Sequence, residues 1–95
     1  MIPIDSVYQQ LVDFARLHNV RRVTLFGSRA RGDALANSDI DIAVEGCPDF
    51  FAFEEDVEEH LWSLTQIDLV NLDEPVSKAL LEDIHRDGTV LYEKI

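Results

Sequence analysis

Cysteine is scarce in this sequence, with Cys47 the only one among 95 residues. A lone cysteine cannot form an intrachain disulfide, and no group of Cys and His residues has zinc-binding spacing. A disulfide-stapled domain is therefore excluded, and a reducing compartment is expected. Long apolar runs are also missing, because no stretch approaches the roughly 20 residues of a membrane span, and the N-terminus lacks a basic segment followed by an apolar run. These absences predict a soluble cytoplasmic protein with no membrane association.

Basic residues are few as well, because 8 Lys and Arg face 19 Asp and Glu and leave a net charge of -11. Such a charge repels the phosphate backbone of a long nucleic acid, so direct nucleic-acid binding and polynucleotide substrates are disfavoured. Five of the eight basic residues nevertheless fall within one stretch of sixteen, namely Arg16, Arg21, Arg22, Arg29 and Arg31. Positive charge is therefore concentrated where a small anion could bind.

What the sequence does contain suits one folded domain. The apolar fraction is 46%, and residues 1–95 contain no internal repeat, linker or low-complexity segment. That fraction is ordinary for a globular fold, although a chain of this length is near the lower end of what buries a self-sufficient core. We therefore expect a single domain over residues 1–95, and any second domain would belong to another chain.

Apolar periodicity predicts helices and strands in alternation. A capping box at Ser6 and Gln9 predicts a first helix that runs to about His18, where Asn19 ends it. Four strands are predicted, at Arg22–Phe26, Asp39–Val44, Gln66–Leu72 and, as an edge strand, Thr89–Tyr92. The first two are joined by a loop with room for one helical turn after Ser28. Two further helices are predicted, one capped by Asp49 with the apolar stripe Phe50, Phe53, Val57, Leu61 and Leu64, and one with Pro75 in its first turn and Gly88 at its end. This order predicts an α+β fold, a mixed sheet of about four strands with helices packed on one side.

The strand Asp39–Val44 carries two acids on one face. Residues two apart on a strand point the same way, with α-carbons about 6.6 Å apart. Asp39 and Asp41 can therefore converge on one hard cation, or on two ions about 3.5 to 4 Å apart. A DxD pattern alone in an acidic protein is more often a water-facing strand surface, so its surroundings decide between the two interpretations.

Those surroundings include a candidate phosphate site. Gly27 and Ser28 follow the preceding strand, and ten residues separate Ser28 from Asp39. A glycine lets backbone amides approach a phosphate, and a serine hydroxyl beside the first amides of a helical turn can bind phosphate oxygens. Arg29 and Arg31 add positive charge, and the sequence leaves open which of them reaches a phosphate. Together these residues place a phosphate cradle beside a metal site, as nucleotidyl transfer requires.

Asp68 is the third acid of the predicted site. It interrupts the apolar strand residues Ile67, Leu69 and Val70, where an unpaired buried charge would be costly. If that strand lies beside Asp39 and Asp41, Asp68 adds an oxygen ligand or acts as the base that deprotonates an attacking hydroxyl. If it is an edge strand, Asp68 can simply face solvent.

The combination of Gly27-Ser28, ten residues, Asp39-Ile40-Asp41 and an aspartate in the next strand resembles the signature of the polymerase-beta-type nucleotidyltransferase superfamily. Within it, GSRARGDALANSDIDIAV most resembles the minimal nucleotidyltransferase (MNT) domains, small prokaryotic antitoxins usually encoded beside a toxin with a HEPN domain. The resemblance extends from the first helix to the last strand. It implies a nucleotidyltransferase fold in which Gly27 and Ser28 bind nucleotide phosphates, Asp39 and Asp41 bind one or two Mg²⁺ ions, and Asp68 completes the site.

The resemblance also implies a reaction and a partner. The expected reaction is adenylyl transfer from ATP, with release of pyrophosphate, onto a tyrosine or similar hydroxyl of a cognate HEPN ribonuclease toxin, which would silence the toxin. The chain would then act as an antitoxin and form a hetero-oligomer with its target. Two alternatives stay open. One is a non-catalytic antitoxin that neutralises the toxin by stoichiometric binding, and the other is a small-molecule nucleotidyltransferase, which would normally need extra sequence for an acceptor pocket.

The remaining polar residues have simpler interpretations. His18, His60 and His85 share no metal spacing and are predicted to be surface or helix-end residues, and Cys47 is predicted to be a small packing residue. The acidic run Glu54–Glu59 is predicted to be a solvated helix face, with use against a basic partner as the alternative. Phe50, Phe51 and Phe53 cannot all point into one core, so at least one can serve an interface.

Overall fold

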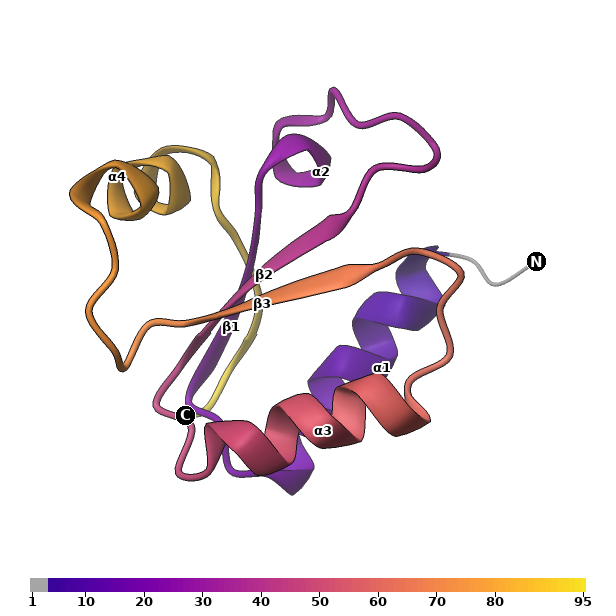
Figure 1. Ribbon diagram of the computed structural model, residues 1–95, viewed down its shortest axis with the longest axis vertical. Coiled ribbons are helices and arrows are strands. Elements are labelled where there is room, and N and C mark those ends of the chain that lie inside the picture. The colour runs from indigo at the N-terminus through magenta and orange to yellow at the C-terminus, as the bar shows by residue number, and fades with distance from the viewer. Residues whose placement is uncertain (1–3) are drawn as a thin grey trace.

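The structure is a computed structural model that describes residues 4–95 as helices and strands in alternation (Figure 1). In chain order the elements are α1 Ile4–Leu17, β1 Arg22–Phe26, α2 Ser28–Arg31, β2 Ile40–Glu45, α3 Phe50–His60, β3 Ile67–Asn71, α4 Lys78–Asp87 and β4 Thr89–Glu93. The strands form one sheet in the order β3-β2-β1-β4. β1 runs antiparallel to both β2 and β4, whereas β2 and β3 are parallel. The predicted α+β class and mixed four-stranded sheet are confirmed.

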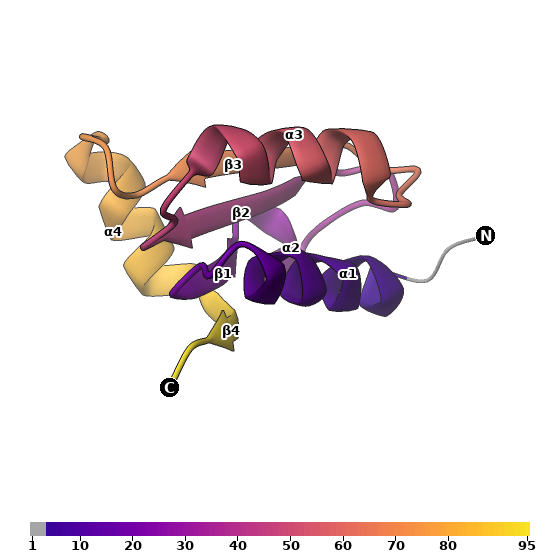
Figure 2. The same cartoon turned by 90° about the horizontal axis from the view of Figure 1, so that it is seen from below.

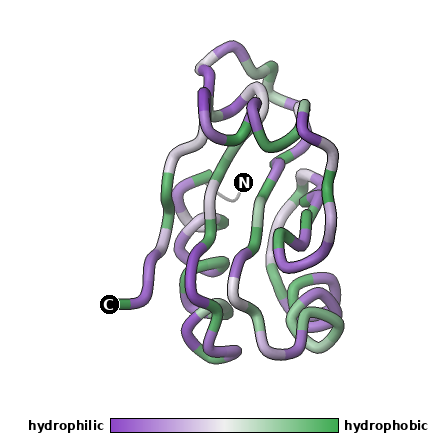
Figure 3. Tube along the Cα trace, turned by 90° about the vertical axis from the view of Figure 1, so that its left-hand side faces the viewer, coloured by the Kyte–Doolittle hydropathy of each residue, from purple (hydrophilic) through white to green (hydrophobic). Residues whose placement is uncertain are grey.

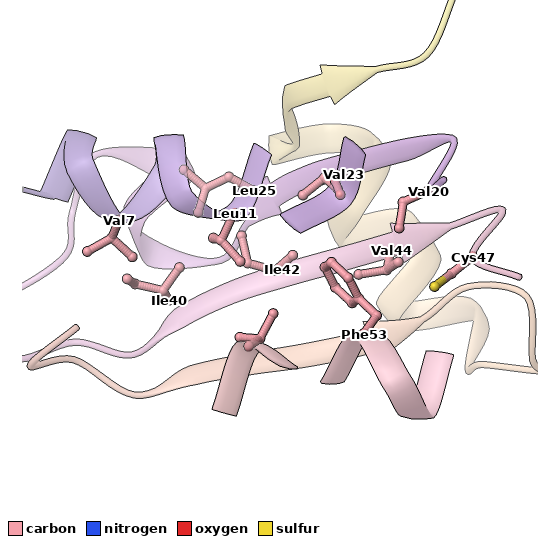
Figure 4. Packing of buried hydrophobic residues seen from close by; sticks show 12 residues of the cluster. Val7, Leu11, Val20, Val23, Leu25, Ile40, Ile42, Val44, Cys47 and Phe53 are labelled. Atoms are coloured by element: carbon pink, nitrogen blue, oxygen red, sulfur yellow. The ribbon is translucent and has the colours of Figure 1, made fainter. Parts of the chain in front are cut away.

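One face of the sheet carries the main core. Side chains alternate along β2, and Ile40, Ile42 and Val44 all point to the face that α1 and α3 cover, where each is fully buried. Figure 4 shows these side chains meeting Leu11 of α1 and Phe53 of α3. Both helices are amphipathic, and their apolar stripes close over the sheet while charged residues face outward, so purple and green alternate along them in Figure 3.

The opposite face carries α4 and a smaller core. Phe26 of β1, Ala43 of β2 and Ile84 of α4 form this second cluster of buried residues, with Leu80 packed against it. Figures 1 and 2 show α1 and α3 together on one side of the sheet and α4 away from them. The expectation of helices on one side is therefore correct for α1 and α3 and wrong for α4. The reason is that β1 and β2 present apolar side chains to both faces, so both need cover.

Three predicted helix boundaries are wrong. The capping box at Ser6 is not formed, because Ser6 lies inside α1, which the structure describes from Ile4 onward. α4 begins at Lys78 rather than near Pro75, because the Ser77 hydroxyl caps it by accepting a hydrogen bond from the Leu80 N–H at 3.1 Å. α3 ends at His60, so Leu64 does not extend the apolar stripe and is 85% exposed. The spacing of residues along the sequence did not show where each of these helices begins or ends.

Other local predictions are confirmed. Asn19 has a positive φ of 57°, and the Val20 N–H donates to the Ala15 carbonyl at 2.9 Å, which is how a left-handed residue ends a helix. The Asp49 carboxylate accepts from the Ala52 N–H at 3.1 Å and caps α3. β1 has the predicted bounds, and a single helical turn does follow Gly27. Within residues 4–95, no helix is long and apolar enough to span a membrane.

Candidate active site

The candidate site is built around the turn at Gly27. β1 ends at Phe26, and Gly27 then adopts φ 74° and ψ -157°, a conformation that favours glycine. Its carbonyl accepts from the Ala30 and Arg31 amides, each at 3.1 Å, which starts α2. A Cβ at position 27 would collide with the carboxylate of Asp41. Glycine is therefore needed twice here, once for the backbone angle and once so that the turn can lie directly against Asp41.

Strand register brings two of the three predicted acids together. Asp41 of β2 lies opposite Phe26 at the end of β1 and directly beside Asp68 of β3 in the parallel ladder. Adjacent strands are about 4.8 Å apart, and partners in register point to the same face. Asp39 immediately precedes β2 and is exposed. The acids therefore gather at one end of the sheet, next to α2.

Asp68 lies on an edge strand of the sheet. Its apolar sequence neighbours suggested a buried position, but the strand is only partly buried. Every residue of β3 is half-buried, so Asp68 is not enclosed in a core. Its carboxylate oxygen Oδ1 accepts from the Gln66 side-chain amide at 3.0 Å. Gln66 is a contact that the sequence interpretation missed, although its spacing of two residues from Asp68 puts both side chains on one side of an extended segment.

Electrostatics around Asp41 favour a cation. Burial raises the pKa of the Asp41 carboxyl above its usual value, and the nearby Asp68 and Asp39 raise it further, while Arg31 lowers it. Like charges that crowd together in this way are relieved by a bound cation, and carboxylate oxygens are the ligands that Mg²⁺ prefers. Among residues 4–95, however, no three His, Cys, Asp or Glu side chains are already gathered as a ready metal cluster. The donor chemistry of the three carboxylates fits magnesium.

The two arginines beside Ser28 have different surroundings. The Arg29 guanidinium donates to the Ser38 carbonyl at 2.8 and 3.1 Å and to the Ala36 carbonyl at 3.3 Å. It therefore ties α2 to the segment that leads into Asp39. Arg31 is exposed, pairs with Asp33 at 3.2 Å, and lies near enough to Asp41 to lower the pKa of that carboxyl. Of the two, Arg31 is the one that lowers the pKa of the Asp41 carboxyl.

Ser28 begins α2 directly after Gly27 and is half-buried. The first amides of a helical turn have no carbonyl partner within that turn, so donors are present at this point. Ser28, Arg31 and the acids around Asp41 thus surround one end of the sheet and combine anion-binding with cation-binding groups.

The histidines and the cysteine lie elsewhere. His18, just after α1, and His60 of α3 both contact Asp56, at 2.8 and 2.7 Å. The His60 contact has helical i,i+4 spacing, whereas sequence spacing did not suggest the His18 contact. Cys47 is buried, and burial raises the pKa of its thiol, which suits a packing role.

A scan of protein families matches residues 9–95 to the family described as "Polymerase beta, Nucleotidyltransferase". No curated protein is significantly similar in sequence to this chain. The fold and the acids at one end of the sheet, together with a family match over nearly the whole chain, define a nucleotidyltransferase domain. The chain belongs to the polymerase beta nucleotidyltransferase family.

Several solved structures with the same fold come from toxin–antitoxin complexes. One is a toxin–antitoxin complex with AMP-PNP, with a TM-score of 0.69, 24% identity, and coverage of 92% of this chain and 73% of that one. The MntA-HepT complex has a TM-score of 0.62 and 22% identity, covering 95% and 73%. The tri-AMPylated HEPN toxin of Shewanella oneidensis in complex with an MNT antitoxin has a TM-score of 0.60 and 20% identity, covering 95% and 72%. Because all three identities are below 25%, these comparisons establish that the folds are alike and nothing more.

Proposed function

We propose that this chain is a magnesium-dependent adenylyltransferase that moves AMP from ATP to a hydroxyl group, most naturally a tyrosine, of a HEPN-domain toxin and thereby acts as its antitoxin. The observation that carries the proposal is the juxtaposition of the Gly27 turn with Asp41, which lies beside Asp68 in the sheet register. This arrangement puts phosphate-binding groups next to metal-binding groups. Family membership supports the same chemistry.

Each residue has a role in this reaction. Ser28 and the amides that open α2 bind phosphate oxygens of ATP, and Arg31 adds positive charge on the same side. Arg29, assigned from the sequence to the nucleotide site, also donates to the Ala36 and Ser38 carbonyls and so positions the segment before Asp39.

The acids supply the rest of the chemistry. Asp39, Asp41 and Asp68 would hold Mg²⁺, which neutralises the charge that develops on the triphosphate during transfer. The acceptor oxygen attacks the α-phosphorus, the bond from that phosphorus to the bridging oxygen breaks, and pyrophosphate leaves with the bonding electrons. Asp68 would accept the proton of the attacking hydroxyl, and its position on an edge strand that an acceptor can approach supports this role.

The partner assignment rests on likeness to other proteins. Several structures with the same fold are toxin–antitoxin complexes, one of them with AMP-PNP and another with an AMPylated HEPN toxin. The net charge of -11 disfavours a nucleic-acid acceptor. The described residues form little beyond the sheet and the helices that cover it, whereas a small-molecule acceptor would normally need extra sequence for a pocket. A protein acceptor is therefore the better match.

Catalysis and simple occlusion differ in stoichiometry, and one experiment separates them. With ATP and magnesium, a small amount of this protein should progressively inactivate an excess of the cognate HEPN toxin, and the toxin should gain the mass of one or more AMP units. Asp39→Asn or Asp41→Asn should abolish the turnover. Asp13→Asn is the matched control, because Asp13 is exposed on α1. Protection that needs equimolar protein, requires no ATP and survives both site substitutions would instead establish a binding antitoxin.

A further inference from the structure

The segment between α3 and β3 exposes two large apolar side chains. Trp62 is 75% exposed and Leu64 is 85% exposed. Both backbone polar groups of Trp62 are nevertheless held by the Gln10 side chain, because the Trp62 N–H donates to it at 2.8 Å and the Trp62 carbonyl accepts from it at 3.0 Å. The Ser63 hydroxyl also donates to the Thr65 carbonyl at 2.8 Å. These bonds present the two apolar side chains on an ordered support.

A groove lies beside this segment. Its volume is about 260 Å³, and its walls include the apolar side chains of Val57, Leu61 and Ile67 together with Glu58 and Gln66. Trp62 and Leu64 do not line the groove themselves but alternate along the segment with Leu61, Ser63 and Thr65, which do. Exposed apolar groups next to a partly apolar groove are typical of sites where a protein docks. The groove is formed by the end of α3 and the start of β3, at the edge of the sheet.

Charge on α3 identifies the kind of occupant. The helix contains five acidic residues and neither Lys nor Arg. Glu55 and Glu58 are exposed and three residues apart, so they share the outer face with Phe51, which is 72% exposed. A second copy of this chain would bring the same negative face and a net charge of -11, and would be repelled. A segment with both basic and apolar side chains is complementary to this surface.

The groove is also connected to the candidate active site. Gln66 lines the groove, and its side-chain amide donates to the Asp68 carboxylate at 3.0 Å. Its carbonyl accepts from the Ile40 N–H at 2.9 Å, one residue after Asp39. A polypeptide held in the groove therefore lies on the α3 side of the edge strand and contacts Gln66, whose side chain is bonded to Asp68 on the other side.

We infer that Trp62, Leu64, the groove and the exposed acidic face of α3 form the docking surface for the acceptor protein. The surface binds a segment that carries apolar and basic side chains, and it delivers the neighbouring hydroxyl to Asp68. This inference rests on the proposed function for the identity of the acceptor. Docking itself requires no nucleotide, so it can be measured separately from transfer.

The test compares surface variants with matched controls by calorimetric titration of the cognate HEPN toxin without nucleotide. Trp62→Ser combined with Leu64→Ser should weaken binding by about tenfold or more, because exposed anchors near a pocket carry much of an interface. Leu17→Ser should leave the affinity unchanged, because Leu17, the last residue of α1, is also largely exposed, at 70%, but is not part of the proposed surface. Glu58→Gln should weaken binding more at low salt than at high salt, and Glu82→Gln on α4 should not. ATP binding should be equal in all variants.

The outcomes distinguish this inference from the proposed function. Parental toxin affinity in the double variant overturns the docking surface, whether or not AMP is transferred. Self-association of the parent chain that the double variant abolishes also overturns it, because the occupant would then be a second copy. Weakened binding in the double variant alone supports the docking surface, and if the parent chain then binds toxin but transfers no AMP, only the proposed function fails.

Discussion

The two faces of the sheet are built from the same strands but serve different purposes. On the α1 and α3 side, Ile40, Ile42 and Val44 are completely buried. On the α4 side, Ala43 is buried against Ile84, while Asp41, two residues earlier on the same strand, is only half-buried. One strand therefore contributes to a core with every second residue and to a polar site with one of the others.

The difference shows how a small domain can combine stability with a charged site. Twelve buried residues belong to the cluster under α1 and α3, against three in the cluster under α4. The larger core can hold the sheet together, which leaves the second face free to keep carboxylates near water at its uncovered end. The acids are tolerated because α4 covers only part of this face, where Phe26, Ala43 and Ile84 lie.

The largest expected effect comes from the same truncation, isoleucine to alanine, made once in each of the two apolar clusters, which differ in size. Ile42→Ala should lower the free energy of unfolding by about 4 kcal/mol, and Ile84→Ala by about 2 kcal/mol, since losses from such truncations grow with the cavity left behind. Ile42 is completely buried, whereas Ile84 is 6% exposed in the smaller cluster. Urea denaturation followed by circular dichroism measures both. Equal losses would show that the two faces contribute alike.

The next comparison concerns two glycines with positive φ on either side of α2. Gly27→Ala should lower AMP transfer by about 100-fold, because the new Cβ displaces the Asp41 carboxylate and small misplacements are costly in catalysis. Gly32→Ala, at φ 86° with no neighbouring atom within 4 Å, should cost only about 1 to 2 kcal/mol of stability. Transfer rates and melting curves of both variants check this. Similar rates would remove the special role of the Gly27 turn.

Ser28 tests the phosphate cradle without disturbing either core. Ser28→Ala should cost about 1 to 3 kcal/mol of ATP binding or transition-state stabilisation, because it removes a hydrogen bond to a charged group. Melting should be unchanged, as it should be for the control Ser6→Ala on the exposed side of α1. An unaltered reaction in Ser28→Ala would identify it as a simple turn serine.

The two arginines beside Ser28 should differ in what they affect. Arg29→Gln should lower stability by about 1 to 2 kcal/mol, because it weakens charged hydrogen bonds to the Ala36 and Ser38 carbonyls. Arg31→Gln should leave melting nearly unchanged and raise the KM for ATP. Steady-state kinetics and thermal melting separate the two effects. The reverse pattern would mean that the assignments of positioning and phosphate binding must be exchanged.

The smallest effect belongs to the α1 and α3 side. Hydrogen bonds from His18 and His60 lower the pKa of the Asp56 carboxyl below its usual value. A lowered pKa in the folded state contributes stability above the unfolded pKa of about 4, and this contribution is lost as the pH falls through the folded-state value. Asp56→Asn should therefore cost less than about 1 kcal/mol at pH 6 and nothing once the parent carboxylate is protonated. Unfolding curves of parent and variant at pH 6 and at successively lower pH test this, because the difference between them should shrink as the pH falls.

Much of the molecule could be predicted from the sequence, because its signals act over short distances. The β1 strand, the turn after Gly27, the Asn19 helix end and the Asp49 cap all depend on residues within a few positions of one another. The spacing from Ser28 to Asp39 and Asp41 identified the family for the same reason. The two-residue alternation of side chains along a strand also separated the apolar residues of β2 from the acids Asp39 and Asp41.

Tertiary structure alone decided the properties that depend on residues far apart in the chain. Strand order made β3 an edge and put Asp68 beside Asp41, and no local pattern specifies a partner strand. Placement of α4 on the second face depended on Phe26 and Ala43 both needing cover. Arg29 and Arg31 look equivalent in the sequence, but the folded chain turns one toward the Ser38 carbonyl and leaves the other near Asp41, because contact energies depend on distance in space.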